Sequence, residues 1–167
     1  MKTLIVYYSR TGTTKRVVEA LARAIRADTA EIRCEAYRPG VLRLIKAVMD
    51  AGRRRPCAPI HPPHLDYAPY ERVVIAAPVW AGRPALPLQA WLKSKPHLPG
   101  RVVLLVTFAG DPSLDKAEET VATLIGRPVE ASFSLAQKDA KGEPLERAVA
   151  AFVEELAADE PPRAAAG

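Results

Sequence analysis

The sequence predicts a single α/β domain: a three-layer, doubly wound fold in which a five-stranded parallel sheet is covered by helices on both faces. Three observations indicate this class. Short apolar runs alternate with segments of helical periodicity, no repeat of 20–50 residues is present, and 167 residues suit one core. The predicted strands are 3–8, 29–35, 72–77, 101–107 and 129–135, and the predicted helices are 13–26, 41–53, 85–95, 114–125 and 143–158. The domain is expected to span residues 1–158 and to be followed by a flexible tail, 159–167.

The segment after the first predicted strand carries the most informative motif. The apolar run of that strand stops at Ser9, and helical spacing starts near Thr13. Unpaired amides and the positive end of the helix dipole converge at such a junction, so a strand, a tight turn and a helix start form an anion site. Hydroxyl side chains concentrate there. The candidate residues are Ser9, Arg10, Thr11, Gly12, Thr13 and Thr14.

Two interpretations of these hydroxyls are open. A threonine at position 13 or 14 can simply cap the helix, but one cap explains one hydroxyl, and four occur within residues 9–14. We therefore predict a phosphate cradle. The segment lacks the first glycine and the glycine–lysine pair of a Walker loop, and it lacks the three glycines of a dinucleotide fingerprint. Hydroxyls and backbone amides are therefore expected to hold the ligand.

Residues 8–14 resemble the flavin-phosphate loop of the flavodoxin-like family, which cradles the terminal phosphate of flavin mononucleotide (FMN). A second segment, residues 77–84, is similar to the P-x-W-x-G-R-P segment of that family, whose backbone and aromatic ring face the flavin. The resemblance implies FMN as the cofactor, with Trp80 stacked on its ring. A tryptophan half-buried against a neighbouring element is the alternative. The residues implied to contact the flavin ring are Pro78, Val79, Trp80, Ala81 and Gly82.

A third segment follows the strand predicted at 101–107. Members of the flavodoxin-like family often have a Thr-x-Gly-Gly turn here, which closes over the pyrimidine end of the flavin, and this chain has Ala109 at the first glycine position. Phe108 is either a ring contact or a core residue. The resemblance implies flavin contacts from Thr107, Phe108, Ala109 and Gly110.

The resemblance covers the chain to about residue 156 and also implies the flavodoxin-like strand order 2-1-3-4-5. In an open sheet, ligands bind beyond the carboxyl ends of the strands where the strand order reverses, and flavodoxins, with FMN between strands 1 and 3, are a standard instance of that rule. The loops after the first and third predicted strands therefore flank one crevice. Neither a catalytic residue nor a metal ligand is expected in this site.

Composition and charge narrow the function classes. No apolar run approaches the roughly 18 residues of a membrane span, so none is expected. The chain start shows no charged leader with a cleavage site, and Cys34 and Cys57 lack paired spacing, so reduced thiols and a cytoplasmic location are expected. The net charge of +5, with arginine at all of positions 53–55, suits an acidic redox partner protein. Nucleic-acid binding is disfavoured, because no aromatic residues interleave with these arginines.

Two function classes remain open. The first, which we favour, is an FMN-bearing electron-transfer protein whose flavin cycles between oxidised, semiquinone and reduced states. The alternative is an enzyme, an NAD(P)H-dependent quinone reductase or similar FMN oxidoreductase that passes hydride to a small-molecule acceptor, although the sequence shows no segment dedicated to nicotinamide. A phosphoacceptor signalling domain of the same topology is set aside, because the first strand ends in Tyr7 and Tyr8 rather than in aspartates.

Overall fold

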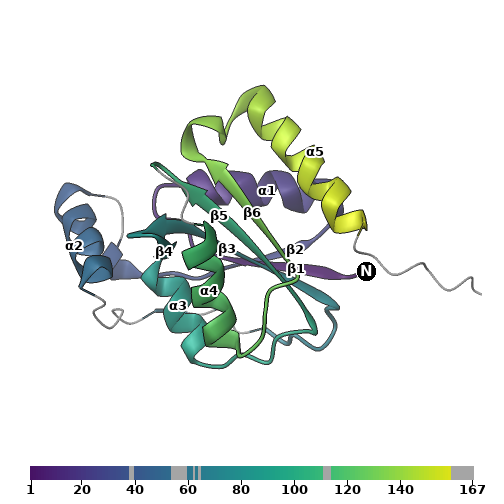
Figure 1. Cartoon of the computed structure of the whole chain (residues 1–167), viewed down its shortest axis with the longest axis horizontal. Coiled ribbons are helices and arrows are strands. Elements are labelled where there is room, and N and C mark those ends of the chain that lie inside the picture. The colour runs from purple at the N-terminus through teal and green to yellow at the C-terminus, as the bar shows by residue number, and fades with distance from the viewer. Residues whose placement is uncertain (38–39, 54–59, 62, 64, 111–113, 159–167) are drawn as a thin grey trace, which may run out of the picture.

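Five parallel strands run through the centre of the molecule in the order β2-β1-β3-β5-β6 (Figure 1). The computed structural model describes residues 1–37, 40–53, 60–61, 63, 65–110 and 114–158. Among the parallel strands alone, the order is the predicted 2-1-3-4-5, so the doubly wound sheet is confirmed. The strands are β1 (Thr3–Tyr7), β2 (Asp28–Glu31), β3 (Arg72–Trp80), β5 (Arg101–Phe108) and β6 (Ala131–Ala136).

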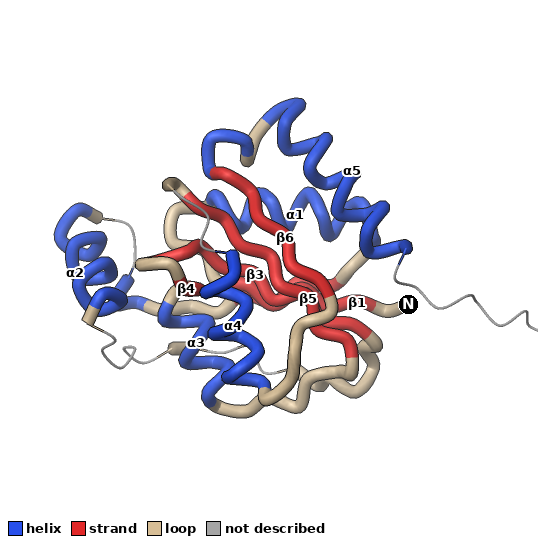
Figure 2. Tube along the Cα trace, viewed as in Figure 1, coloured by secondary structure: helices blue, strands red, loops and turns tan. Residues whose placement is uncertain are grey.

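Helices cover both faces of the sheet (Figure 2). One face packs against α1 and α5, and the other against α3 and α4. The remaining helix, α2, lies beyond the carboxyl ends of the strands, at the left of Figure 1. The helices are α1 (Thr13–Ile25), α2 (Val41–Gly52), α3 (Leu86–Lys93), α4 (Leu114–Ile125) and α5 (Gly142–Ala158), with the short 3-10 helices η1 (Glu35–Tyr37) and η2 (Gln137–Asp139).

The strands divide their side chains between two cores, because successive residues of a strand point to opposite faces. In β1, Leu4 and Val6 belong to the core shared with α3 and α4. Ile5 and Tyr7 belong to the core shared with α1 and α5. Strands β1, β3 and β5 are buried on both faces, which explains why their sequences are nearly continuous apolar runs.

The largest differences between the predicted and observed strands are at the ends of β2 and β3. β2 stops at Glu31 rather than at residue 35, because its partner β1 stops at Tyr7, the residue paired with Glu31. β3 continues to Trp80 rather than stopping at residue 77, and its end pairs with a further, antiparallel strand, β4 (Arg83–Pro84). Neither this two-residue strand nor the two 3-10 helices is long enough to produce a periodic signal in the sequence.

Several expectations fall on residues outside the described ranges. The predicted tail 159–167, the second cysteine Cys57 and two of the three clustered arginines, Arg54 and Arg55, are among them. Cys34 is buried. Within the described residues, no helix combines the length and apolar character needed to cross a membrane.

Candidate functional site

The three loops singled out in the sequence begin at one edge of the sheet. Tyr7, at the end of β1, is paired with Ala76 of β3, and Pro78 of β3 is paired with Thr107 of β5. Because these strands are parallel and adjacent, their carboxyl ends lie together. The phosphate-type loop, the tryptophan segment and the loop after β5 therefore leave the sheet side by side, as the topology predicts.

Ser9 organises the loop after β1. Its Oγ accepts hydrogen bonds from the backbone amides of Gly12 and Lys15, at 3.2 Å each. Gly12 is the N-cap of α1 and has φ +89°, a left-handed conformation that glycine adopts without steric cost. The loop is thus closed by a hydroxyl from the strand side, and the N-cap contributes no side chain of its own.

The start of α1 leaves donors available for a ligand. The first amides of a helix have no acceptor inside the helix, and of the first three here only that of Lys15 meets an acceptor among the described residues. The amides of Thr13 and Thr14 point out of the helix start beside the positive end of its dipole. The hydroxyls of Thr11, which is exposed, and Thr13 lie 3.5 Å apart. This donor set is the one that an anion requires.

Arg10 adds a fixed positive charge to the loop. Its Nη2 donates to the carbonyl oxygen of Gly40, just before α2, at 2.9 Å. Its Nε is buried and has no hydrogen-bond partner among the described residues. A guanidinium stays charged throughout the physiological range, and a buried N–H without an acceptor is costly. The loop of residues 9–14 therefore contains a buried donor for which the described residues supply no acceptor.

Thr14 has a different environment from the other hydroxyl residues of the loop. Its side chain is buried, and its Oγ1 lies 2.8 Å from Oγ1 of Thr107 at the end of β5. One of these hydroxyls donates to the other, so Thr14 has a protein partner without any ligand. Of the four hydroxyls, this one also joins the loop after β1 to β5.

Trp80 lies at the carboxyl end of β3, half-buried among aromatic residues. Its ring meets Tyr8 edge-on, with centroids 5.7 Å apart and an interplanar angle of 89°. It meets Tyr37 of η1 in the same manner, at 5.4 Å and 81°. These T-shaped contacts hold the indole over the end of β1, next to the phosphate-type loop. Tyr8 and Tyr37 were not among the predicted site residues.

The turn after Trp80 is a tight β-hairpin. Trp80 pairs with Arg83 and Val79 with Pro84, so Ala81 and Gly82 are the two central residues of the turn. Their φ angles are +49° and +77°. Positive φ at both central positions is the signature of a type I′ turn. Glycine adopts this conformation without steric cost, so Gly82 is unstrained, whereas the side chain of Ala81 makes its conformation strained. The hairpin thereby fixes the position of the Trp80 backbone, from which the indole extends.

The loop after β5 faces a different neighbour. Phe108 is half-buried, whereas Ala109 and Gly110 are exposed. These three residues line a cavity of about 400 Å³ together with residues 136–139 at the end of β6. A second cavity of about 180 Å³, on the side of β2, is lined by residues that include Tyr8, Ser9, Arg10 and Tyr37. Trp80 lines neither, so the predicted residues share an edge of the sheet but not one of these cavities.

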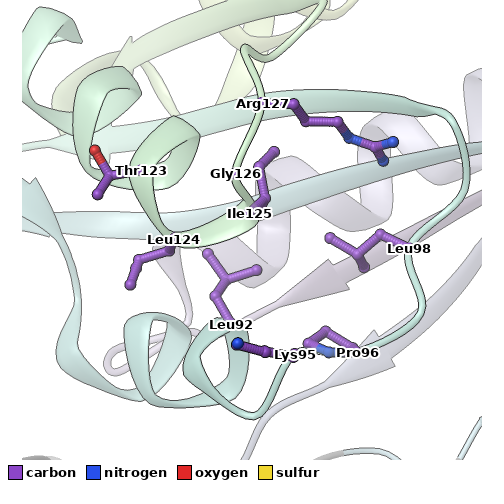
Figure 3. Close-up of a pocket in the computed structure, with 9 residues that line it drawn as sticks. All are labelled: Leu92, Lys95, Pro96, Leu98, Thr123, Leu124, Ile125, Gly126 and Arg127. Carbon is purple, nitrogen blue, oxygen red and sulfur yellow. The ribbon is translucent and has the colours of Figure 1, made fainter.

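The cavity shown in Figure 3 has no part in this arrangement. Its volume is about 480 Å³, and its lining residues come from the ends of α3 and α4, Leu92 and Leu124 among them, and from the segment before β5. That position is the amino-terminal edge of the sheet, opposite the predicted loops. Among the described residues, no group of three or more His, Cys, Asp or Glu side chains is placed to hold a metal ion.

One titratable group close to the site, the Tyr7 phenol, has a pKa above its ordinary value. Burial raises the pKa of Tyr7 from 10.0 to about 12, and the nearby carboxylates of Glu31 and Glu19 act in the same direction. Its phenol therefore stays neutral at physiological pH. Tyr7 faces the core under α1 and α5, away from Trp80.

Comparison with known protein families and with curated proteins finds no match. Solved structures do match. A flavoprotein from Lactobacillus acidophilus NCFM, in complex with FMN, aligns with a TM-score of 0.68 at 24% identity over 80% of this chain and 92% of that one. A protein from Bacteroides uniformis ATCC 8492 aligns with a TM-score of 0.69 at 21% identity, over 92% and 97% of the two chains. The flavodoxin, WrbA-like protein from Agrobacterium tumefaciens aligns with a TM-score of 0.55 at 16% identity, over 96% and 99%.

At identities of 24% and below, these likenesses concern the arrangement of the backbone. They agree with the order of the strands and the layers of helices on the sheet. The resemblance drawn from the sequence is confirmed at that level: this chain has the flavodoxin-like fold.

Proposed function

We propose that the chain binds FMN at the carboxyl edge of its sheet and works as an electron-transfer protein. The observation that carries the proposal is the loop of residues 9–14, which holds uncapped amides at the start of α1, the hydroxyls of Thr11 and Thr13, and Arg10, whose buried Nε has no hydrogen-bond partner among the described residues. These groups fit a phosphate, since all of them are donors and no acidic side chain lies within the loop. The related fold of the Lactobacillus acidophilus flavoprotein, solved in complex with FMN, supports the same assignment.

In this proposal the residues divide into two groups. Arg10, Thr11 and Thr13, with the amides at the start of α1, hold the phosphate. The hairpin of residues 78–82 and the loop of residues 107–110 border the flavin ring, with Trp80 as the aromatic contact. Ser9 and Thr14 act within the protein, since both already hold the loop together through hydrogen bonds. When bound, FMN supplies the redox chemistry by taking up and giving back one or two electrons.

Electron transfer is favoured over the alternative, an NAD(P)H-dependent quinone reductase, because no nicotinamide-binding segment is found in the sequence. The electron acceptor is a redox partner protein or a small molecule. We place the protein in the cytoplasm, because Cys34 and Cys57 lack the spacing of a disulfide framework in the sequence. The FMN-binding domain is taken to be residues 1–158, with 159–167 as its tail.

The proposal is tested on purified protein by flavin extraction and titration. FMN is expected at one per chain, and riboflavin, which lacks the phosphate, is expected to bind at least tenfold more weakly. Recovery of FAD, or failure to bind any flavin after reconstitution, contradicts the proposal. Reductive titration then separates the two function classes. Two separate one-electron steps support electron transfer, whereas direct bleaching by NADPH with rapid quinone turnover supports the reductase.

A further inference from the structure

Helix α2 exposes an apolar face. Leu42 is 82% exposed, Ile45 51% and Met49 43%. These residues are spaced three and four positions apart, so their side chains lie on one face of the helix. In Figure 1, α2 projects beyond the ends of the strands, where the sheet does not cover it. Large side chains of this kind gathered on one exposed face mark an interaction surface.

The exposed charged residues of α2 and its C-cap share one sign. Arg43, Lys46 and Arg53 are exposed on α2 and its C-cap. The one acidic residue of the helix, Asp50, is 4% exposed, and its Oδ2 lies 2.6 Å from Nζ of Lys46. The surface of α2 is therefore apolar at its centre and positive around it. A partner with matching chemistry has apolar side chains ringed by carboxylates.

Two contacts join α2 to the candidate cofactor site. At its start, the carbonyl of Gly40 accepts the hydrogen bond from Arg10, a residue of the phosphate-type loop. In its last turn, the Asp50 carboxylate accepts a hydrogen bond from the Tyr37 hydroxyl at 3.1 Å, and the Tyr37 ring packs on Trp80. A protein that binds to α2 therefore lies close to the loop of residues 9–14 and to Trp80.

From this placement we infer that the Leu42, Ile45 and Met49 face of α2, with Arg43 and Arg53, docks an acidic redox protein that exchanges electrons with the bound cofactor. The inference rests on the proposed function. A face of three large apolar residues is small, which is typical of brief electron-transfer encounters. In the exchange, the reduced flavin loses one electron to the oxidised centre of the partner for each encounter, and the protons of the reduced ring pass to water.

Charge argues against a second copy of the chain as the occupant. In a two-fold dimer the same surface meets itself, so Arg43 and Arg53 of one copy would approach those of the other. Like charges brought together this way oppose association. The net charge of +5 adds to the repulsion between copies and to the attraction of an acidic protein.

The experiment compares two electron acceptors that differ only in charge. Native cytochrome c is basic, and the same protein with its lysines succinylated is acidic. FMN-loaded protein is reduced with dithionite and freed of excess reductant, and stopped-flow absorbance follows the reduction of haem iron from Fe(III) to Fe(II). Succinylated cytochrome c is expected to react at least about tenfold faster than the native form at low salt, and its rate is expected to fall as salt is added.

Matched variants assign the effect to α2. Arg43→Glu is expected to slow the succinylated acceptor about threefold to tenfold, and the double variant Leu42→Ser, Ile45→Ser is expected to slow it at high salt as well. The controls make the same changes elsewhere: Arg23→Glu on the exposed surface of α1, and Leu65→Ser at another exposed apolar residue. Both controls are expected to stay within about twofold of the unaltered protein. All five substituted positions are exposed, and folding of each variant is checked by its FMN content.

Several outcomes overturn the inference. Equal rates for the two acceptors, or equal effects of Arg43→Glu and Arg23→Glu, show that no specific face is used. A dimer in sedimentation that Leu42→Ser dissolves assigns the face to a second copy. Binding to phosphatidylglycerol vesicles that Leu42→Ser abolishes, without discrimination between the cytochromes, assigns it to a membrane surface. If the purified protein takes up no FMN, the proposed function fails and the docking inference fails with it, whereas FMN uptake without discrimination overturns the docking inference alone.

Discussion

Thr14 Oγ1 and Thr107 Oγ1 lie 2.8 Å apart in the interior, although 93 residues separate them in the chain. Thr14 belongs to the first turn of α1, and Thr107 is the last residue but one of strand β5. The hydrogen bond therefore fixes the start of the helix relative to the sheet. Because the amides of that same turn are the proposed phosphate donors, the bond also fixes the direction in which they point.

Replacing one member of this pair should cost stability. In Thr14→Val the hydroxyl of Thr107 keeps its burial and loses its partner, so the free energy of unfolding is expected to fall by about 1–3 kcal/mol. Urea unfolding measures the change. The double variant Thr14→Val, Thr107→Val should be less destabilised than the sum of the two single variants, because no unpaired hydroxyl is left. Additive effects would show that the two hydroxyls are not coupled.

The outward hydroxyls should matter for FMN instead. Thr11→Ala, Thr13→Ala removes two hydrogen bonds to a charged phosphate, each contributing about 1.5–3 kcal/mol, and FMN affinity is expected to fall at least tenfold. Riboflavin affinity should hardly change, since riboflavin has no phosphate. Isothermal titration with both ligands checks this. Lys15→Ala is the comparison: the amide of Lys15 is bound to Ser9 and its side chain is exposed, so a larger loss of FMN in that variant would contradict the proposed donor set.

Substitution of Trp80 should affect mainly FMN affinity, whereas substitution of Trp91 should affect mainly the stability of the fold. Trp80→Ala is expected to weaken FMN binding by about 0.5–1.5 kcal/mol, the contribution of an aromatic contact, with a smaller effect on unfolding. Trp91 is 1% exposed within the core, so Trp91→Ala is expected to lower the free energy of unfolding by about 3–5 kcal/mol. In a Trp91→Phe background Trp80 is the remaining tryptophan of the chain, and FMN should quench its emission. Emission unchanged by saturating FMN would remove Trp80 from the site.

Stability should depend on the ionisation of Tyr7 at high pH. Because its pKa is raised from 10.0 to about 12 in the folded chain, the folded state holds the phenol proton more tightly than the unfolded state does. The stabilisation is complete below about pH 10 and is lost between pH 10 and about pH 12, by on the order of 2 kcal/mol. Unfolding in urea at pH 9 and pH 11 measures it. Tyr7→Phe keeps the ring and cannot ionise, so its stability should fall less over that interval; an identical fall in both proteins would contradict the assignment.

Much of the fold could be predicted because β1, β3 and β5 are buried on both faces and therefore appear as apolar runs. The hairpin was missed for a local reason. Pro78 lacks an amide hydrogen and is uncommon in a central strand, so the strand was expected to end before it. β4 has two residues, which is too short for the alternation of apolar and polar residues that identifies a strand in a sequence.

The candidate site was predictable only in part, because several of its contacts join distant parts of the chain. The hydroxyls of residues 9–14 could be identified as a group, but the burial of Thr14 depends on Thr107, which no local pattern reveals. Tyr37 belongs to a single 3-10 turn, and its contacts with Trp80 and Asp50 exist only in the folded chain. An aromatic residue in an irregular segment carries no sign of its partners.

The attachment of α2 has a consequence for local unfolding. Leu42, Ile45 and Met49 stay half or largely exposed, whereas Ala47 is buried in the core, and hydrogen bonds join Gly40 and Asp50 to Arg10 and Tyr37. The free energy of opening of α2 should therefore lie below that of the central strands. Anything that binds the exposed face then stabilises the helix by a free energy that grows with the logarithm of its concentration above Kd. The rate of amide exchange along α2 thus reports occupancy of that face without any electron having to move.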